Sequence, residues 1–118
     1  LELTRSAQKV RSFAFCSDTA FHEPIIEQIK NVDLLYHEAT FLNDLKERAI
    51  QTKHSTTIEA ATIALKANVG KLIIGHYSQR YFDLEPLLKE AKSVFENSNL
   101  AIEGETHELL RTYDTDRR

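Results

Sequence analysis

The sequence predicts a single α/β domain, because three of its features agree. Short segments rich in Val, Ile, Leu and Phe recur along the chain and are typical of strands. The segments between them place apolar residues at helical spacing, and polar residues follow several of the expected strands. Alternating strands and helices favour a largely parallel sheet with helices packed on it. At 118 residues, the chain is long enough for one such domain and too short for two.

The first expected strand is Val10–Cys16, whose residues alternate between two faces and which ends at short polar side chains. A helix is expected within Phe21–Lys30, where three isoleucines have helical spacing and Pro24 suits the first turn. Asp33–Thr40 is the second expected strand, and it also ends in polar residues. Residues 41–53 show no clear pattern, and we expect a loop that contains a short helix.

A second helix is expected to begin after Thr56, because Thr56 and Glu59 have the spacing of a capping box. Gly70 is expected to close this helix. Three apolar residues share one of its faces: Ile58, Ala61 and Leu65.

The third strand is expected at Lys71–Gly75, where an apolar run with two β-branched residues indicates burial on both faces. Asp83 is expected to cap a third helix, along which apolar residues continue to Val94 at helical spacing. A last strand is expected at Leu100–Ile102, paired with Glu108–Leu110 or continuing into it through a bulge.

Composition limits the class of protein further. The formal net charge of −3 gives no overall field that would attract nucleic acid, although a local basic site is allowed. The single cysteine, Cys16, excludes an internal disulfide and fits a reducing cytoplasm. No apolar run approaches the roughly 18 residues of a membrane span. The sequence contains no methionine and starts at Leu1, so we expect it to be a piece of a longer polypeptide.

Side chains with acid–base or metal-binding chemistry follow three expected strands and precede one expected helix. They are Asp18, Glu38, His54 and His76. The carboxyl ends of strands in an α/β sheet form the crevice in which ligands bind. Carboxylates and imidazoles at such an edge suggest a metal-assisted hydrolase site.

Each of these residues also has a structural interpretation. Asp18 can be a turn or cap residue, Glu38 can be solvated at a sheet end, and His54 can be an exposed loop histidine. Cys16 is expected to be a small buried apolar residue rather than a nucleophile. Of the remaining histidines, His37 is expected to have a structural role, and His22 and His107 are expected at the surface.

Four segments share their wording and order with a known family: Ser17-Asp18-Thr19, His37-Glu38-Ala39-Thr40-Phe41, His54-Ser55-Thr56 and Gly75-His76-Tyr77-Ser78-Gln79-Arg80-Tyr81. The family that they resemble is ribonuclease Z, the tRNA 3′-processing endonuclease of the metallo-β-lactamase superfamily. The intervals from Asp18 to His54 and from His54 to His76 match as well, and the resemblance extends from about Val10 to Leu110.

The chain departs from the family in three respects. Ser17 stands where the family usually has glycine, and Gln79 stands where serine is common. The family's His-x-His-x-Asp-His metal motif, a further histidine ligand and the arm that grips tRNA lie upstream and are absent here. The resemblance therefore implies that residues 1–118 are one domain, the carboxyl-terminal half of an αββα sandwich, with a mixed sheet flanked by helices.

The resemblance also implies a mechanism with two zinc ions between the halves of the sandwich. Asp18 would bridge both ions and His76 would bind one of them. Zinc would activate the attacking water, His54 would protonate the leaving 3′ oxygen, and Glu38 would orient His54. The residues expected to hold the phosphate are Arg80 and Ser78. The implied substrate is precursor tRNA, whose 3′ trailer is removed by a cytoplasmic homodimer.

We expect the chain alone to bind zinc weakly or not at all and to leave tRNA uncut, because two ligands are fewer than zinc requires. Half a sandwich would expose apolar surface, so we expect it to form a homo-oligomer. Three alternatives stay open. The first is another metallo-β-lactamase-fold phosphodiesterase that acts on small or cyclic phosphodiesters. The others are a catalytically silent scaffold or interaction domain, and an unrelated α/β ligand-binding domain.

Overall fold

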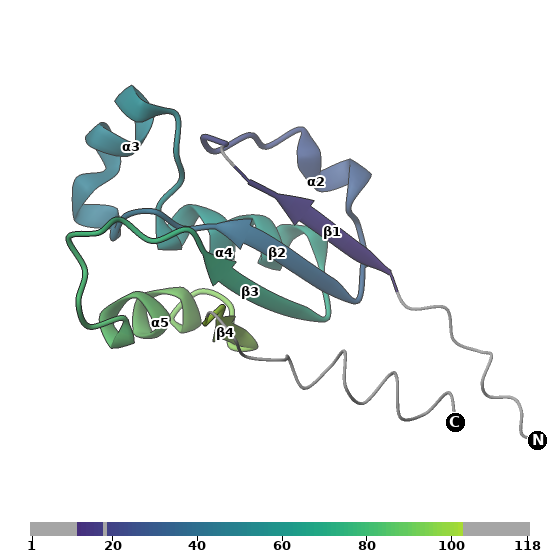
Figure 1. Cartoon of the computed structure of the whole chain (residues 1–118). Helices are drawn as coiled ribbons and strands as arrows, with labels where there is room; N and C mark the ends of the chain where they lie inside the picture. The colour runs from purple at the N-terminus through teal and green to yellow at the C-terminus, as the bar shows by residue number, and fades with distance from the viewer. Residues whose placement is uncertain (1–11, 18, 103–118) are drawn as a thin grey trace, which may run out of the picture.

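Four strands form one sheet in the computed structural model, which describes residues 12–17 and 19–102. The strands are β1 (Phe13–Cys16), β2 (Leu34–Glu38), β3 (Lys71–Gly75) and β4 (Ser98–Leu100). They lie side by side in chain order, and each neighbouring pair is parallel (Figure 1). The predicted α/β class and largely parallel sheet are confirmed. The antiparallel strand that a mixed sheet would need does not occur among the described residues.

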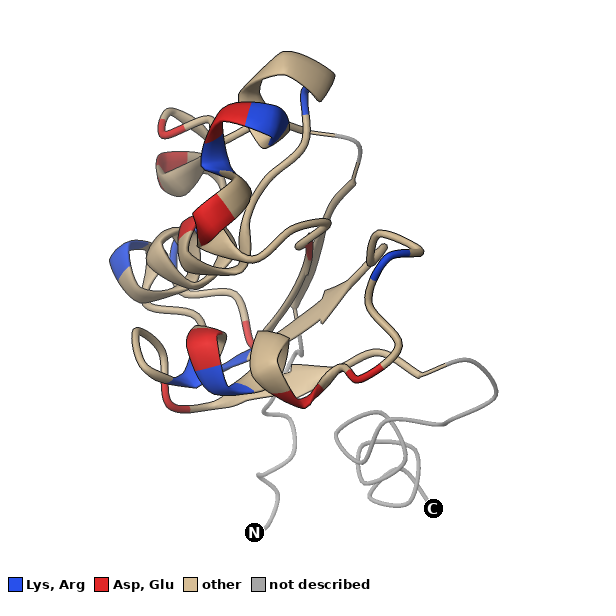
Figure 2. Cartoon of the chain, turned by 90° about the vertical axis from the view of Figure 1, so that its left-hand side faces the viewer, with Lys and Arg blue, Asp and Glu red and all other residues tan. Residues whose placement is uncertain are grey.

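Helices connect the strands in the predicted order. The single-turn α2 (Ile25–Gln28) lies between β1 and β2, α4 (Thr57–Ala67) between β2 and β3, and α5 (Glu85–Lys92) between β3 and β4. The loop expected after β2 contains the 3₁₀ turn η1 (Asn43–Leu45) and the short helix α3 (Lys46–Thr52). Figure 2 shows acidic and basic residues interspersed along these helices, which agrees with the small net charge of the chain.

Two elements differ from the prediction in their extent. α2 is much shorter than Phe21–Lys30, because Pro24 stands directly before it and Asn31 has a left-handed backbone with φ of 65°. Ile26 and Ile29 are buried and Ile25 is partly buried against the core, so their spacing predicted the packing correctly. β4 begins at Ser98 rather than at Leu100, and the expected segment Glu108–Leu110 lies outside the described residues.

The predicted capping box begins α4. The Thr56 hydroxyl accepts a hydrogen bond from the Glu59 backbone N–H at 3.2 Å, and the Glu59 carboxylate accepts one from the Thr56 N–H at 3.0 Å. The helix is closed by Asn68, with φ of 57°, and not by Gly70. Gly70 is needed for another reason, since a Cβ there would lie 2.6 Å from the carbonyl oxygen of Asp33.

The face of α4 that carries Ile58, Ala61 and Leu65 is only partly buried, because the Leu65 side chain is 55% exposed. The helix packs mainly through small side chains, which allow its backbone to approach the sheet closely. The buried apolar residues of α4 are Ala60, Ala61, Ile63, Ala64 and Ala67.

α5 begins at Glu85, and the predicted cap Asp83 accepts a hydrogen bond from the Glu85 N–H at 3.1 Å. Leu87 and Ala91 of this helix are fully buried, as their spacing predicts. Together with α2 and α4, the helix covers one face of the sheet, and the core lies between them. The largest core residues from strands and helices are Leu35, Leu72, Ile74, Ile63 and Leu87.

The opposite face of the sheet carries aromatic residues that the described part of the chain leaves open. Phe13 and Phe15 of β1 are 51% and 75% exposed, and the Phe15 ring stacks on Tyr36 with centroids 4.5 Å apart. The Tyr36 ring lies over Gly75, where a Cβ would approach the tyrosine hydroxyl to 2.3 Å. Within residues 12–17 and 19–102, we find no helix long and apolar enough to cross a membrane.

Candidate active site

Three segments meet at the carboxyl ends of β2 and β3. Glu38 is the last residue of β2, His76 follows the last residue of β3, and His54 precedes the first turn of α4. Backbone hydrogen bonds join the segments: the Ala39 N–H donates to Gly75 at 2.8 Å, and the Thr40 N–H donates to Ser55 at 2.9 Å. The edge of the sheet therefore holds one carboxylate and two imidazoles in fixed relation, as the parallel topology predicts.

Glu38 is completely buried and accepts four hydrogen bonds. Its Oε1 accepts from the His54 ring at 2.8 Å and from the Thr19 N–H at 2.9 Å. Its Oε2 accepts from the Ser55 N–H at 2.8 Å and from the Thr40 hydroxyl at 2.9 Å. Burial alone would raise the pKa of this carboxyl, but the four donors outweigh it and hold the pKa below its usual value. Glu38 is therefore ionised.

The contact with Glu38 fixes the orientation of His54. Because an ionised carboxylate can only accept, the proton of this hydrogen bond is on Nδ1 of the imidazole. Nε2 is left as the nitrogen that can give or take a proton, or bind a metal. The ring is 22% exposed and lies between two others, with its centroid 5.2 Å from that of His76 and 6.5 Å from that of Phe41. The Glu38–His54 contact that the sequence suggested is confirmed.

His76 is held in a backbone conformation that side chains other than glycine rarely adopt, with φ of 62°. Its Nδ1 lies 3.1 Å from the Thr40 hydroxyl. Since that hydroxyl gives its only proton to Glu38, it accepts from His76, and Nδ1 of His76 is protonated. Nε2 is then the ring nitrogen that a metal could bind. Backbone strain of this kind, maintained by surrounding contacts, is a feature of functional sites.

The donor atoms at this edge fit a transition-metal ion in part. One ligand atom from each of Glu38, His54 and His76 lies within 4.8 Å of the others, and imidazole with carboxylate suits zinc and similar metals. However, the four lone-pair positions of the Glu38 carboxylate already accept four hydrogen bonds. The histidines therefore offer the more accessible ligand atoms. Asp18, the other predicted ligand, lies outside the described residues.

Ser78 and Arg80 follow His76 in a turn beside this cluster. The Ser78 N–H donates to the Thr40 carbonyl at 2.9 Å, and the Arg80 N–H donates to the Ser78 hydroxyl at 3.3 Å. The Arg80 side chain is exposed, with its guanidinium carbon 5.8 Å from the centre of the Phe41 ring. Phe41 is 5% exposed and therefore fills the space between Arg80 and His54.

The structure decides between several of the alternative interpretations. Glu38 is not solvated, and His54 is bonded to it rather than being a free loop histidine. His37 is 1% exposed and donates from Nδ1 to the Glu38 carbonyl at 2.8 Å, which is the structural role expected. His22 is exposed, as predicted, and His107 lies outside the described residues. Burial raises the pKa of the half-buried Cys16 thiol, which disfavours a nucleophilic thiolate.

The sequence interpretation missed Thr19, Thr40 and Ser55, the residues that complete the hydrogen bonds of Glu38. Each is a short residue with a hydroxyl, and each stands within one of the four segments that resemble ribonuclease Z. Their place within these segments was the signal that could have identified them. It does not show which backbone or hydroxyl group donates to Glu38, because the three residues come from different segments.

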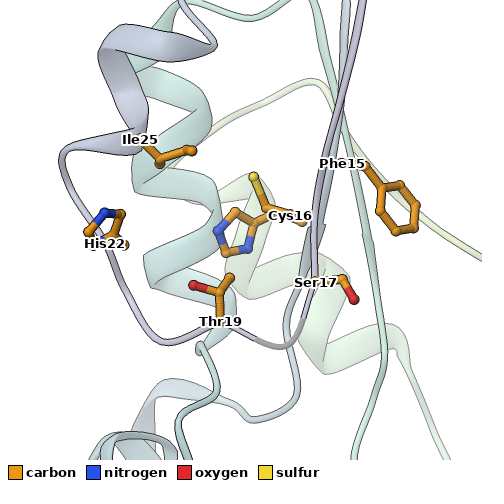
Figure 3. A pocket seen from close by; sticks show the side chains of 7 residues that line it. Phe15, Cys16, Ser17, Thr19, His22 and Ile25 are labelled. Carbon is orange, nitrogen blue, oxygen red and sulfur yellow. The ribbon is translucent and has the colours of Figure 1, made fainter.

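A separate pocket of about 190 Å³ lies between β1, the start of α2 and His37 of β2. Figure 3 shows Cys16, Thr19, His22 and Ile25 around it, with Phe15 pointing to the opposite side of β1. The pocket is lined largely by apolar surface and adjoins the active-site segment without containing Glu38, His54 or His76. Its lining residues are Phe15, Cys16, Ser17, Thr19, His22, Ile25 and His37.

Comparison with solved structures defines the class of protein. The chain resembles the metallo-β-lactamase fold protein YhfI from Bacillus subtilis, with a TM-score of 0.71 and 30% sequence identity. That match covers 77% of this chain and 37% of YhfI. The described sheet and helices are therefore part of a metallo-β-lactamase fold, as the resemblance implied. No model of a protein family matches the sequence.

Within this class, the particular protein that the chain resembles is ribonuclease Z. This chain is 52% identical over 103 residues to the ribonuclease Z of Cytophaga hutchinsonii, and the match covers 87% of this chain and 33% of that protein. A long-form RNase Z from yeast matches with a TM-score of 0.56 and 34% identity, over 74% of this chain and 12% of the yeast chain. The predicted resemblance is confirmed. The chain spans about a third of the length of the curated relatives that it matches.

Proposed function

We propose that this chain forms the carboxyl-terminal part of a zinc-dependent ribonuclease Z, an endonuclease that removes the 3′ trailer from precursor tRNA. The observation that carries the proposal is the buried Glu38–His54 pair, 2.8 Å apart, with the His76 ring beside it. The similarity to ribonuclease Z of Cytophaga hutchinsonii supports the same substrate. The proposal includes a cytoplasmic location and a homodimeric longer protein.

In this proposal, His54 is the general acid for the leaving 3′ oxygen. Ionised Glu38 accepts from Nδ1 of the ring, which leaves Nε2 as the nitrogen that would donate the proton. Glu38 is therefore a positioning residue, and its four hydrogen bonds keep it from moving. Proton donation to a poor leaving group is worth about 100- to 10,000-fold in rate.

His76 and Asp18 are the proposed metal ligands of this chain. Nδ1 of His76 donates to Thr40, so Nε2 is the ring nitrogen proposed to bind zinc. When bound, zinc supplies an attacking water whose pKa is lowered to about 7. Two ligands are fewer than the three or four that zinc needs, so the remaining ligands would come from the longer protein. The chain alone is therefore expected to bind zinc weakly or not at all, and to be inactive.

Arg80 and Ser78 are the proposed phosphate-binding residues. The Arg80 guanidinium is exposed beside Phe41, where its planar donors can meet the oxygens of a phosphate. The Ser78 hydroxyl accepts from the Arg80 N–H and keeps its own proton for a second acceptor. Both residues lie within four positions of His76, so phosphate and metal would meet at one place.

The test is cleavage of a precursor tRNA with a 3′ trailer by the longer protein that contains this chain. Cleavage after the last templated nucleotide is expected, and His54→Ala should lower kcat by about 100-fold or more. His22→Ala is the matched control, because His22 is exposed outside the site. If the precursor is not cut, or if His54→Ala and His22→Ala have the same activity, the proposal is wrong.

A second candidate is a metallo-β-lactamase-fold phosphodiesterase that acts on small or cyclic phosphodiesters. The TM-score of 0.71 with YhfI, against 0.56 with the yeast RNase Z, supports it only in that the fold is shared with a protein that is not named as an RNase. Turnover of a small phosphodiester without cleavage of precursor tRNA would select this candidate. Bound zinc with neither activity would select the catalytically silent scaffold.

The open face of the sheet supports a further part of the proposal. Phe13 and Phe15 would be covered by the remainder of the longer protein, and the isolated chain would self-associate through them. Sedimentation of the isolated chain tests this, and Phe15→Ser should shift it toward the monomer. A wild-type chain that is monomeric at high concentration would remove this part of the proposal.

A further inference from the structure

In the segment between β3 and α5, residues 76–84, one large apolar side chain is exposed while the others are packed against the core. Tyr77, Tyr81 and Leu84 pack against the hydrophobic core. Phe82 is 98% exposed, the highest value among the exposed large apolar residues of the described chain. Its ring therefore contributes almost nothing to the folding of this part of the protein, although burial of a phenylalanine ring would stabilise a fold.

Hydrogen bonds fix the segment on both sides of Phe82. The Leu42 N–H donates to the Tyr81 hydroxyl at 2.8 Å, and the Tyr81 N–H donates to the Ser78 carbonyl at 3.1 Å. On the other side, Asp83 accepts a hydrogen bond at 3.1 Å from the N–H of Glu85, the first residue of α5. The exposure of Phe82 is therefore a property of a well-anchored turn, since its neighbours on both sides have fixed positions.

Phe82 also stands beside the proposed phosphate-binding residue. Arg80 is two residues earlier, so their Cα atoms are at most about 7 Å apart. The Arg80 guanidinium is exposed and lies 5.8 Å from Phe41, whose ring contacts His54. A partner that reaches Phe82 at this edge therefore meets a cation and an aromatic ring together. A nucleotide can make both contacts, because its phosphate can pair with the cation and its base can stack on the ring.

We propose that the ring of Phe82 stacks on a base of the RNA strand next to the scissile phosphate. The inference rests on the proposed function, because it takes RNA as the substrate, and it adds a residue that holds the strand in place. Stacking on an aromatic side chain tolerates every base, so Phe82 would contribute affinity for single-stranded RNA without selecting a sequence.

The competing occupant is another part of the longer protein, since exposed apolar side chains are also covered by protein. Two substitutions separate the possibilities. Phe82→Trp keeps a large aromatic surface for stacking but is too large for a close-packed protein contact. Phe82→Leu keeps apolar volume for a protein contact but has no ring to stack.

The experiment measures binding by the longer protein carrying His54→Ala, so that the RNA stays intact. The probes are a fluorescently labelled precursor tRNA with a 3′ trailer and the same RNA with abasic nucleotides beside the scissile phosphate. Phe82→Ala and Phe82→Leu should each weaken binding of the first probe by about 5- to 100-fold, and Phe82→Trp should stay within about twofold. Wild type and Phe82→Ala should bind the abasic probe equally.

Leu65→Ala is the control, because Leu65 is an exposed apolar residue about 12 Å along α4 from Thr57 and should not affect binding. The inference is overturned if Phe82→Ala binds the precursor as the wild type does. It is equally overturned if Phe82→Leu keeps the affinity while Phe82→Ala lowers the melting temperature, because protein then covers the ring.

Cleavage of the precursor by the same protein with His54 intact is measured separately. If Phe82 controls binding but the precursor is not cut, the proposed function fails and the stacking contact stands. If the precursor is cut but binding does not depend on the ring, the proposed function stands and the stacking contact fails.

Discussion

The ends of β2 and β3 contribute to the same candidate site in opposite ways. At the end of β2, Glu38, Thr40 and the facing Ser55 are each at most 6% exposed and bond to one another. At the end of β3, Arg80 and Phe82 project into solvent. The buried side can orient a proton donor because nothing in it is free to move, whereas the exposed side is placed to meet a substrate. The predictions below test this division.

The largest effect is expected for Glu38→Ala. The substitution removes the acceptor of four buried or partly buried donors, including two backbone N–H groups, so we expect the free energy of unfolding to fall by about 3 kcal/mol. Urea denaturation of the longer protein measures the change. Glu47→Ala on the exposed face of α3 is the control and should change stability by no more than about 0.5 kcal/mol. Equal losses in the two variants would contradict the buried network.

A smaller loss is expected for Thr40→Val, which keeps the shape of the side chain and removes its hydroxyl. That hydroxyl donates to Glu38 and accepts from His76, so we expect a loss of about 1–2 kcal/mol. Thermal unfolding gives the stability, and NMR of the His76 ring should report a changed tautomer. Stability and tautomer both unchanged would mean that Thr40 does not link the two residues.

The decrease in the free energy of unfolding at acid pH should depend on Glu38. Its pKa in the folded protein lies below the usual 4.5, so its ionisation contributes stability above that value. This contribution is lost as the pH falls through the folded pKa. We therefore expect the wild type to lose more stability than Glu38→Gln between pH 7 and the acid range, as followed by urea unfolding at several pH values. Parallel profiles for the two proteins would show that Glu38 is not the responsible group.

The smallest effect on stability is expected for Arg80→Ala. The side chain is exposed and makes one cation–π contact, so the free energy of unfolding should change by no more than about 1 kcal/mol. Its effect on precursor binding should be larger, and it should lessen the dependence of binding on salt. Chemical denaturation and RNA titrations at several salt concentrations separate the two effects. A large loss of stability would contradict this account, because it would mean that Arg80 supports the fold as the buried residues around Glu38 do.

Most of the fold could be predicted because periodicity reports burial directly. β1, β2, β3, the capping box at Thr56 and the apolar spacing of α5 were predicted from local patterns and are confirmed. β4 overlaps its predicted range only at Leu100. α2 and the buried face of α4 were less well predicted. The extent of α2 depends on the left-handed backbone of Asn31, and the position of Leu65 depends on which face of α4 meets the sheet. Neither is set by the local pattern alone.

The candidate site was predicted as a set of residues but not as an arrangement. The motifs shared with ribonuclease Z identified Glu38, His54 and His76 as site residues, and the parallel sheet explains why they lie close together. The other three hydrogen bonds of Glu38 could not be predicted, because their donors come from three segments whose spacing depends on the folded structure. The exposure of Phe82 could not be predicted either, since its neighbours Tyr81 and Leu84 are equally apolar and pack inward.

The most direct test of the central claim, that Glu38 acts by orienting His54, is a double-mutant cycle. It compares kcat/KM on precursor tRNA for the longer protein with Glu38→Gln, His54→Ala and both changes together. If Glu38 acts through His54, the double variant should be no slower than His54→Ala alone. Arg80→Ala combined with His54→Ala serves as the control, and its two losses should multiply. Losses from Glu38→Gln and His54→Ala that also multiply would mean that the carboxylate and the imidazole act independently.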